Sequence, residues 1–134
     1  MAEEQREKIT GEAGLTVCGS NTAKTMKSGS LDVLATPAVA ALMEEASCNA
    51  IIDLLPEGST TVGILLNLHH TSATPVGMKV TAVSRLLSHE GRKYTFEIRA
   101  FDEAGEIADA YHERFEVKTE TFMKKANSKK EENR

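Results

Sequence analysis

The hydrophobic positions of residues 37–55 repeat with the period of a helix. Thr36 followed by Pro37 is typical of a helix start, with the threonine as N-cap and the proline in the first turn. No breaker interrupts this stretch before Pro56 and Gly58. At about 100° per residue, one broad side of the helix is apolar and a narrow side is polar. The polar side carries Glu45, Asn49 and Asp53.

Beyond this helix, the pattern changes to stretches with strand character separated by short turn signals. The predicted strands are residues 61–71, 79–87, 93–101 and 107–118, and a weaker apolar patch at 15–18 is a candidate first strand. A long helix followed by an antiparallel meander predicts a two-layer α+β domain with the sheet packed on the helix. Because the apolar side of the helix is so broad, we expect the sheet to curve around it or a second subunit to complete its burial.

Glu44 lies near the centre of the apolar side of the predicted helix. A carboxylate removed from water needs hydrogen-bond donors or a cation to compensate its charge. Two interpretations follow from the pattern alone. Glu44 is either a general base or nucleophile, or a structural group that caps a buried polar group or pairs across a subunit interface.

His70 ends an apolar row in the first strand after the helix. Alternation puts Val62, Ile64, Leu66, Leu68 and His70 on one face, and Gly63, Leu65, Asn67 and His69 on the other. A histidine in such a place is commonly a hydrogen-bonded edge residue, but facing the helix that carries Glu44 it becomes a candidate acid-base partner. His69 points the opposite way in a strand and cannot share a metal ion with it, so we expect no metal site.

The composition bounds the class of protein. A chain of 134 residues with 40% hydrophobic residues is the size of one domain, which we place at residues 11–122 after a charged segment at 1–10. A net charge of -4 without a basic stripe argues against a nucleic-acid surface. The end of the chain, 123–134, belongs to a locally basic stretch. It predicts a solvated flexible tail or a place that attracts a phosphorylated ligand.

The sequence also bears on the location of the protein. The charged start lacks an apolar core, and no apolar run is long enough to span a bilayer. Cys18 and Cys48 have no motif spacing, which indicates two reduced thiols rather than a disulfide or a metal pair. We therefore expect a cytoplasmic protein that does not bind membranes.

Three segments resemble a known family. VLATPAVAALMEEA, HHTSATPVG and YHERFEV are similar to the fluoroacetyl-CoA-thioesterase-like group of hotdog-fold thioesterases, over most of residues 11–122. The resemblance implies a hotdog fold, in which an antiparallel sheet wraps around one long central helix, and a homodimer with shared active sites. It also implies hydrolysis of a small or medium acyl-CoA, with coenzyme A as part of the substrate and no cofactor. The family's catalytic threonine, glutamate and histidine match Thr36, Glu44 and His70.

The resemblance assigns roles with some choices left open. Glu44 either attacks the thioester carbonyl or deprotonates a water, His70 orients or protonates, and Thr36 donates a hydrogen bond or is only the N-cap. Backbone N–H groups at a helix start or in the loop ending at Gly63 are candidates for holding the oxyanion and the substrate. Because eight helical residues rise about 12 Å, Thr36 and Glu44 of one chain should not touch, and we expect the site to combine two chains at a dimer interface.

The chain departs from the family at two places that concern the substrate. Members selective for fluoroacetyl groups have an aromatic lid before the threonine, whereas this chain has no aromatic residue before Tyr94. Glu45 stands where an aromatic residue follows the catalytic glutamate. These differences argue against a fluoroacetyl substrate. The alternative functions are a non-catalytic acyl-CoA binding module, in which Glu44 and His70 only position a ligand, and a hydratase, whose usual aspartate-histidine signature is lacking.

Overall fold

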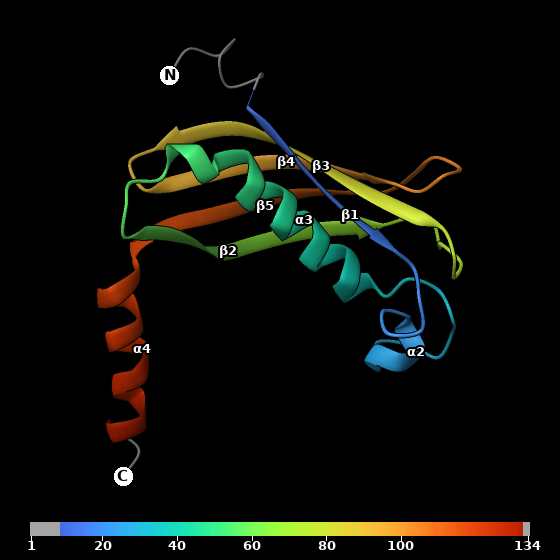
Figure 1. The fold of residues 1–134 in the computed structure, drawn as a ribbon, viewed down its shortest axis with the longest axis horizontal. Coiled ribbons are helices and arrows are strands. Elements are labelled where there is room, and N and C mark those ends of the chain that lie inside the picture. The colour runs from blue at the N-terminus through green and yellow to red at the C-terminus, as the bar shows by residue number, and fades with distance from the viewer. Residues whose placement is uncertain (1–8, 133–134) are drawn as a thin grey trace.

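The computed structural model describes residues 9–132 and shows one antiparallel sheet curled around a long helix (Figure 1). The predicted α+β architecture with a central helix is therefore confirmed. The strands are β1 (Thr10–Thr16), β2 (Ser59–His70), β3 (Lys79–Glu90), β4 (Lys93–Phe101) and β5 (Glu106–Lys118). The helices are α2 (Ala23–Met26), α3 (Thr36–Ile51), the 3₁₀ turn η1 (Ile52–Leu54) and α4 (Thr119–Glu132). Most of the charged segment 1–10 lies outside the described residues.

The order of strands in the sheet is β1-β3-β4-β5-β2, so the predicted meander is correct only for β3, β4 and β5. Strand β2 pairs with β5 and lies at an edge. The cause is the segment that joins β2 to β3. It leads from the β2 edge of the sheet past β5 and β4, so that β3 lies beside β4 and β1. It is held there because Leu34 N–H donates to the Thr74 carbonyl and Val17 N–H donates to the Met78 carbonyl, both at 2.9 Å. This crossing leaves one side of β2 without a strand partner in the described part of the chain.

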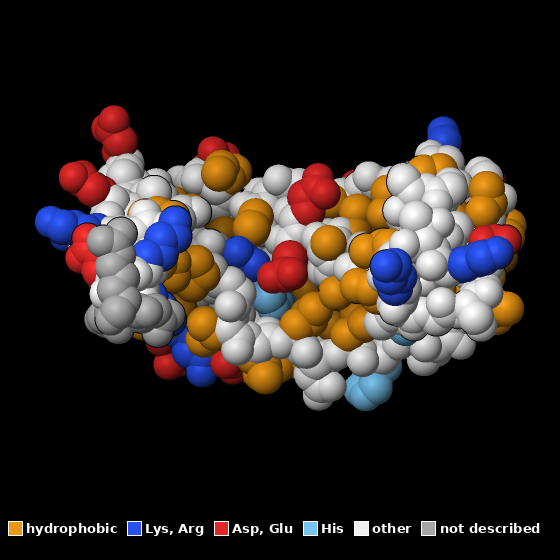
Figure 2. All heavy atoms as spheres, turned by 90° about the horizontal axis from the view of Figure 1, so that it is seen from below, with side chains coloured by type: hydrophobic (Ala, Val, Ile, Leu, Met, Phe, Trp, Pro, Cys, Tyr) orange, Lys and Arg blue, Asp and Glu red, His pale blue; other side chains and the backbone are white. Residues whose placement is uncertain are grey.

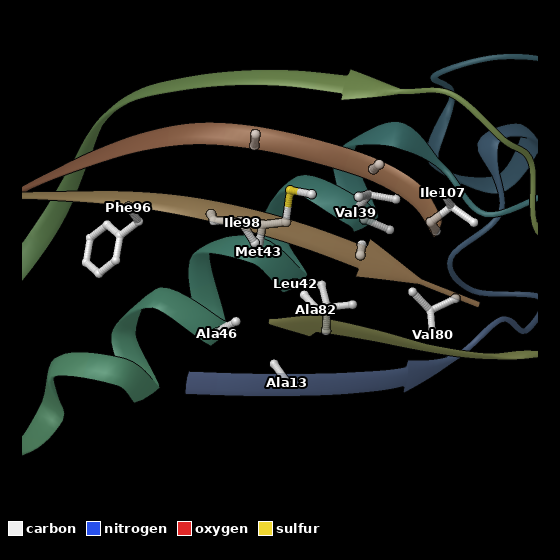
Figure 3. Packing of buried hydrophobic residues seen from close by; sticks show 14 of the residues in the cluster. Ala13, Val39, Leu42, Met43, Ala46, Val80, Ala82, Phe96, Ile98 and Ile107 are labelled. Carbon is white, nitrogen blue, oxygen red and sulfur yellow. The ribbon is translucent and has the colours of Figure 1, made fainter. Parts of the chain in front are cut away.

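The hydrophobic core lies between α3 and the concave face of the sheet (Figure 3). Val39, Met43 and Ala46 of the helix are fully buried, as are Phe96 and Ile98 of β4. Burying a side chain of the size of Met43 stabilises the fold by about 1.5–3 kcal/mol. The core thus fixes which side of α3 faces the sheet and, with it, the direction of every other side chain on that helix.

The start of α3 differs from the sequence prediction. The N-cap is Ala35, whose carbonyl accepts hydrogen bonds from Ala38 N–H at 3.0 Å and Val39 N–H at 3.1 Å. Thr36 is already helical, so the prediction that it is the N-cap is wrong. Its hydroxyl is not needed to close the first turn and is free for another contact.

The end of the central helix and the end of the chain also differ from the sequence prediction. The α-helix ends at Ile51 rather than at residue 55, and the last residues form the 3₁₀ turn η1. Residues 119–132 form a helix, α4, where the sequence indicated only a tail from residue 123. Within the described residues no helix has the length and apolar character needed to cross a membrane. Cys18 and Cys48 are free thiols, as predicted.

Candidate active site

Thr36 and His70 meet at the start of α3. The Thr36 hydroxyl and His70 Nδ1 are 2.8 Å apart and share a hydrogen bond, which brings together two of the predicted site residues. The other ring nitrogen of His70, Nε2, is buried and has no hydrogen-bond partner within the described chain. A cavity of about 260 Å³ lies beside this pair. His70 is therefore oriented through one nitrogen and has the other available for a further contact.

Glu44 lies on the side of α3 next to the side that faces the core, above strand β2. Its side chain is 43% exposed, so the prediction that it sits in the centre of a buried face is wrong. The reason is that β2 is the last strand of the sheet and nothing in the described chain covers the helix beyond it. Arg114 of β5 is the compensating cation, with Nη1 donating to Glu44 Oε2 at 3.3 Å. The carboxylate is held on one side by this charge and opens on the other side into a cavity of about 220 Å³.

Arg114 is itself buried, with 8% of its side chain exposed, and its donors are fixed by the surrounding residues. Nε donates to the Thr61 hydroxyl at 2.8 Å and Nη2 to the Thr61 carbonyl at 3.0 Å. Nη1 lies 3.3 Å from His112 Nε2 as well as from Glu44. A guanidinium held at several donors is rigid, so it presents a preorganised positive charge to the carboxylate.

His112 completes this arrangement as a neutral imidazole. Its Nδ1 donates to the Leu65 carbonyl at 2.8 Å, which leaves Nε2 as the acceptor for Arg114. Burial lowers the pKa of the His112 imidazole below its usual value, and the Arg114 charge acts in the same direction. A protonated His112 would place a second positive charge beside a buried guanidinium and remove its hydrogen-bond acceptor.

The lowered pKa of His112 predicts that stability depends on pH. In the unfolded chain the imidazole gains a proton near its ordinary pKa of about 6.5, whereas in the folded chain it does so only at lower pH. The unfolded state therefore binds more protons in this window, and the free energy of unfolding falls as the pH drops from 7.5 to 5. We expect His112→Gln to show a weaker loss of melting temperature over this range. Equal pH slopes for the two proteins would contradict this explanation.

Gly63 makes the close approach of Glu44 to the strand possible. A β-carbon built at Gly63 would lie 2.6 Å from Glu44 Oε2 and 3.3 Å from Arg114 Nη1. The sequence placed Gly63 on the face opposite His70 and in a loop, and both placements are wrong. A bulge between Gly63 and Leu65 inserts Ile64 as an extra residue in strand β2. The bulge shifts the alternation, so Thr61 and Gly63 face α3 together with His70.

The structure thus groups the predicted residues into two clusters. We call Thr36 and His70 the hydroxyl-imidazole pair, and Glu44 with Arg114, His112 and Gly63 the carboxylate cluster. The two lie against the same strand but at different places along it, since Gly63 and His70 are seven positions apart in β2. No hydrogen bond joins them within the described chain.

Sequence reasoning interpreted His112, which alternates with Arg114 in the last strand, as a structural residue and assigned neither of them to the site. Both belong to the buried alternating row of β5, together with Ala108 and Ala110. A cation in a row of alanines needs a buried partner for the same reason that a carboxylate on an apolar helix face does. The signal in the sequence is that Arg114 and Glu44 are opposite charges, each at an otherwise apolar position, which predicts that they pair with each other.

The two clusters contain groups that can carry out acyl transfer. A carboxylate beside a fixed cation can act as base or nucleophile, and an imidazole with one free nitrogen can move a proton or orient a reacting group. A sheet curled around one central helix is the arrangement of the hotdog fold, and the carboxylate and imidazole at its edge strand are groups that a thioester hydrolase can use.

The comparisons with known proteins identify the family. The chain belongs to the fluoroacetyl-CoA-specific thioesterase family (FlK), whose model matches residues 17–120 and so ends near the start of α4. The chain is similar to the fluoroacetyl-CoA thioesterase of Streptantibioticus cattleyicolor, at 36% identity over 98 residues, 73% of this chain and 70% of that relative.

Solved structures agree with this assignment. A structure of the fluoroacetyl-CoA thioesterase FlK superposes with a TM-score of 0.85 at 29% identity, over 90% of this chain and 93% of the other. A thioesterase-superfamily protein of Thermus thermophilus gives a TM-score of 0.85 at 23% identity, over 92% and 91% of the two chains, which shows the fold alone.

Proposed function

We propose that this thioesterase hydrolyses the acyl-CoA of a small or medium acyl group, with Glu44 as the base or nucleophile. The observation that carries the proposal is the position of the Glu44 carboxylate. It is half exposed beside a cavity, it is paired with the fixed guanidinium of Arg114, and strand β2 has a glycine, Gly63, where it passes the carboxylate. A carboxylate placed in this way is ready to attack a carbonyl or activate a water there.

The acyl group is inferred from the cavities. The cavity beside the hydroxyl-imidazole pair is about 260 Å³ and contains no Phe, Tyr or Trp in its lining. This agrees with the lack of aromatic residues before Tyr94. The relatives are named for fluoroacetyl-CoA, but without an aromatic lid near Thr36 we propose that this enzyme prefers a different short or medium acyl chain.

The substrate is tested by free-thiol release from a panel of acyl-CoA thioesters, including fluoroacetyl-CoA, acetyl-CoA and longer, branched and aromatic chains. We expect the highest kcat/KM for a short or medium chain other than fluoroacetyl. Fluoroacetyl-CoA as the best substrate would contradict the argument from the missing lid. Binding of acyl-CoA without thiol release would contradict the hydrolase.

We also propose a homodimer formed through strand β2. This strand has a free edge in the described chain, and Ile64 and Leu65 on it are 52% and 46% exposed. Seen from the β2 side, hydrophobic side chains gather across the middle of the molecule between α4 and the region of α2 (Figure 2). Antiparallel pairing of β2 with its copy would run the Gly63 end of one chain toward the His70 end of the other. Each site would then combine the carboxylate cluster of one chain with the hydroxyl-imidazole pair of its partner.

Mixed dimers test this shared site. Glu44→Gln and His70→Ala are each expected to be inactive alone. After unfolding and refolding an equal mixture, half of the dimers contain one chain of each kind, and each of these has one intact site. Activity should therefore return to about a quarter of the wild-type value. No recovery, with dimers present by light scattering, would mean that each site lies within one chain.

Thr36 is proposed to orient His70 through the hydrogen bond between its hydroxyl and Nδ1. Because Thr36 is not the N-cap, Thr36→Val should leave the melting temperature almost unchanged and lower kcat about tenfold, the effect of one lost hydrogen bond in the reacting state. Thr36→Ser retains the hydroxyl and should retain most of the activity. Equal losses in both variants would contradict this role.

For the compartment we propose the cytoplasm, where both free thiols would stay reduced.

A further inference from the structure

Helix α4 and one end of the sheet line an open cavity that neither cluster uses. Its volume is about 350 Å³, and it lies between the first turns of α4, the paired ends of β2 and β5, and the turn that joins β3 to β4. The helix projects beyond β2, away from the body of the molecule (Figure 1). Its start is fixed because Thr119 N–H donates to the Gly58 carbonyl at 3.0 Å.

The cavity is lined by three cations, Arg92, Lys118 and Lys125. In the described part of the chain none of them forms an ion pair with a carboxylate. Glu116 is the acidic residue of the lining, and it accepts a hydrogen bond from the buried Tyr94 hydroxyl at 2.9 Å. A positive cavity on a chain of net charge -4 is a local feature that favours an anionic ligand.

The same cavity also offers an apolar surface. Phe122 of α4 lines it and is 40% exposed, and Val117 and Pro56 lie in the same lining. An exposed aromatic ring beside cations suits a nucleotide, since the base stacks on the ring while the cations bind the phosphates. An inorganic anion alone would make no use of Phe122.

The cavity also lies at a suitable distance from the carboxylate cluster. Ser59 pairs with Lys118 at the cavity, and Gly63 pairs with Arg114 below Glu44. Four strand residues separate these two pairs, which corresponds to roughly 13 Å. This distance is comparable to the length of an extended pantetheine arm, which joins the nucleotide of coenzyme A to the thioester.

We propose that this cavity binds the adenosine 3′-phosphate 5′-diphosphate end of the acyl-CoA substrate. Lys118, Lys125 and Arg92 contact the phosphates, and Phe122 stacks on the adenine. The proposal rests on the acyl-CoA substrate proposed above, and it gives α4 a role in substrate binding.

A direct test is the binding of adenosine 3′,5′-bisphosphate, measured by calorimetry on the full chain. The test variant is Lys118→Ala in β5 with Lys125→Ala in α4, and the matched control is Lys129→Ala with Lys130→Ala, which removes the same charge from the far end of α4, outside the cavity lining. We expect Kd to rise about tenfold in the test variant and less than twofold in the control. Equal weakening in both variants, or no binding to the wild type, would overturn the proposal.

A kinetic test separates this proposal from the hydrolase itself. The same acyl group is offered on coenzyme A and on pantetheine, which lacks the nucleotide. The ratio of kcat/KM for the two thioesters should fall about tenfold in the Lys118 and Lys125 variant and should stay at the wild-type value in the Lys129 and Lys130 control. A ratio unaffected in both would overturn the nucleotide site while leaving the hydrolase intact. Failure of the wild type to hydrolyse either thioester would instead overturn the proposed function.

Discussion

Glu44→Gln should lower kcat by a factor of about 10²–10⁴, the usual contribution of a general base. Glutamine has nearly the same shape and can still contact Arg114 through its carbonyl oxygen, but it can neither accept a proton from water nor form an acyl intermediate. Because the glutamine oxygen still accepts from the buried Arg114 guanidinium, that group is not left without a partner and the melting temperature should change little. Thiol release measured beside thermal unfolding gives both quantities.

Glu45→Gln is the matched control for this experiment. Glu45 is the next residue on α3 and is exposed to solvent, so the same chemical change there should alter kcat less than twofold. If Glu44→Gln retained more than a tenth of the wild-type activity, Glu44 would be only the structural partner of Arg114.

Gly63→Ala should lower kcat/KM about a hundredfold without unfolding the protein. The new β-carbon would lie 2.6 Å from Glu44 Oε2, but the carboxylate is the end of a flexible side chain and can swing aside. A displacement of about 1 Å from the reacting position is enough to cost about 10²-fold in rate. Steady-state kinetics and the melting temperature, measured on the same preparation, check the two halves of this prediction.

Gly11→Ala provides the opposite control. A β-carbon at Gly11 of β1 would collide with the backbone of Ala46 and Ala50 in α3, which cannot move without shifting the helix. We expect about 1–3 kcal/mol of lost stability and wild-type activity per folded molecule. A Gly63→Ala enzyme with wild-type kinetics would show that the carboxylate is not required at that place.

Local patterns predicted most of the fold. The helical period of residues 37–55 and the bounds of β4 needed only neighbouring residues, because these elements obey their intrinsic periods. The position of β2 at the edge could not be predicted in this way. It depends on hydrogen bonds between Leu34, Val17 and the segment before β3, which lie far apart in the sequence.

The site was predicted in part, for a similar reason. Glu44 and His70 were candidates from the hydrophobic pattern, the resemblance added Thr36, and the structure pairs Thr36 with His70. The burial of Glu44 was overestimated because a helical wheel does not show where a sheet ends. Arg114 was missed because its charge has meaning only next to Glu44, seventy residues earlier in the chain.

The bulge in β2 has a consequence for which changes this site can tolerate. Ile64 is the extra residue of the bulge, and it contributes no side chain to the carboxylate cluster. Removing it would let β2 pair with β5 without interruption, because Gly63 and Leu65 already pair with the consecutive residues Arg114 and Glu113, so Thr61 and Gly63 would still face α3. What the deletion would take away is the local bend and extra twist that a bulge gives a strand. A chain one residue shorter would therefore keep every reactive group on its face and change only the angle between the two parts of the edge strand.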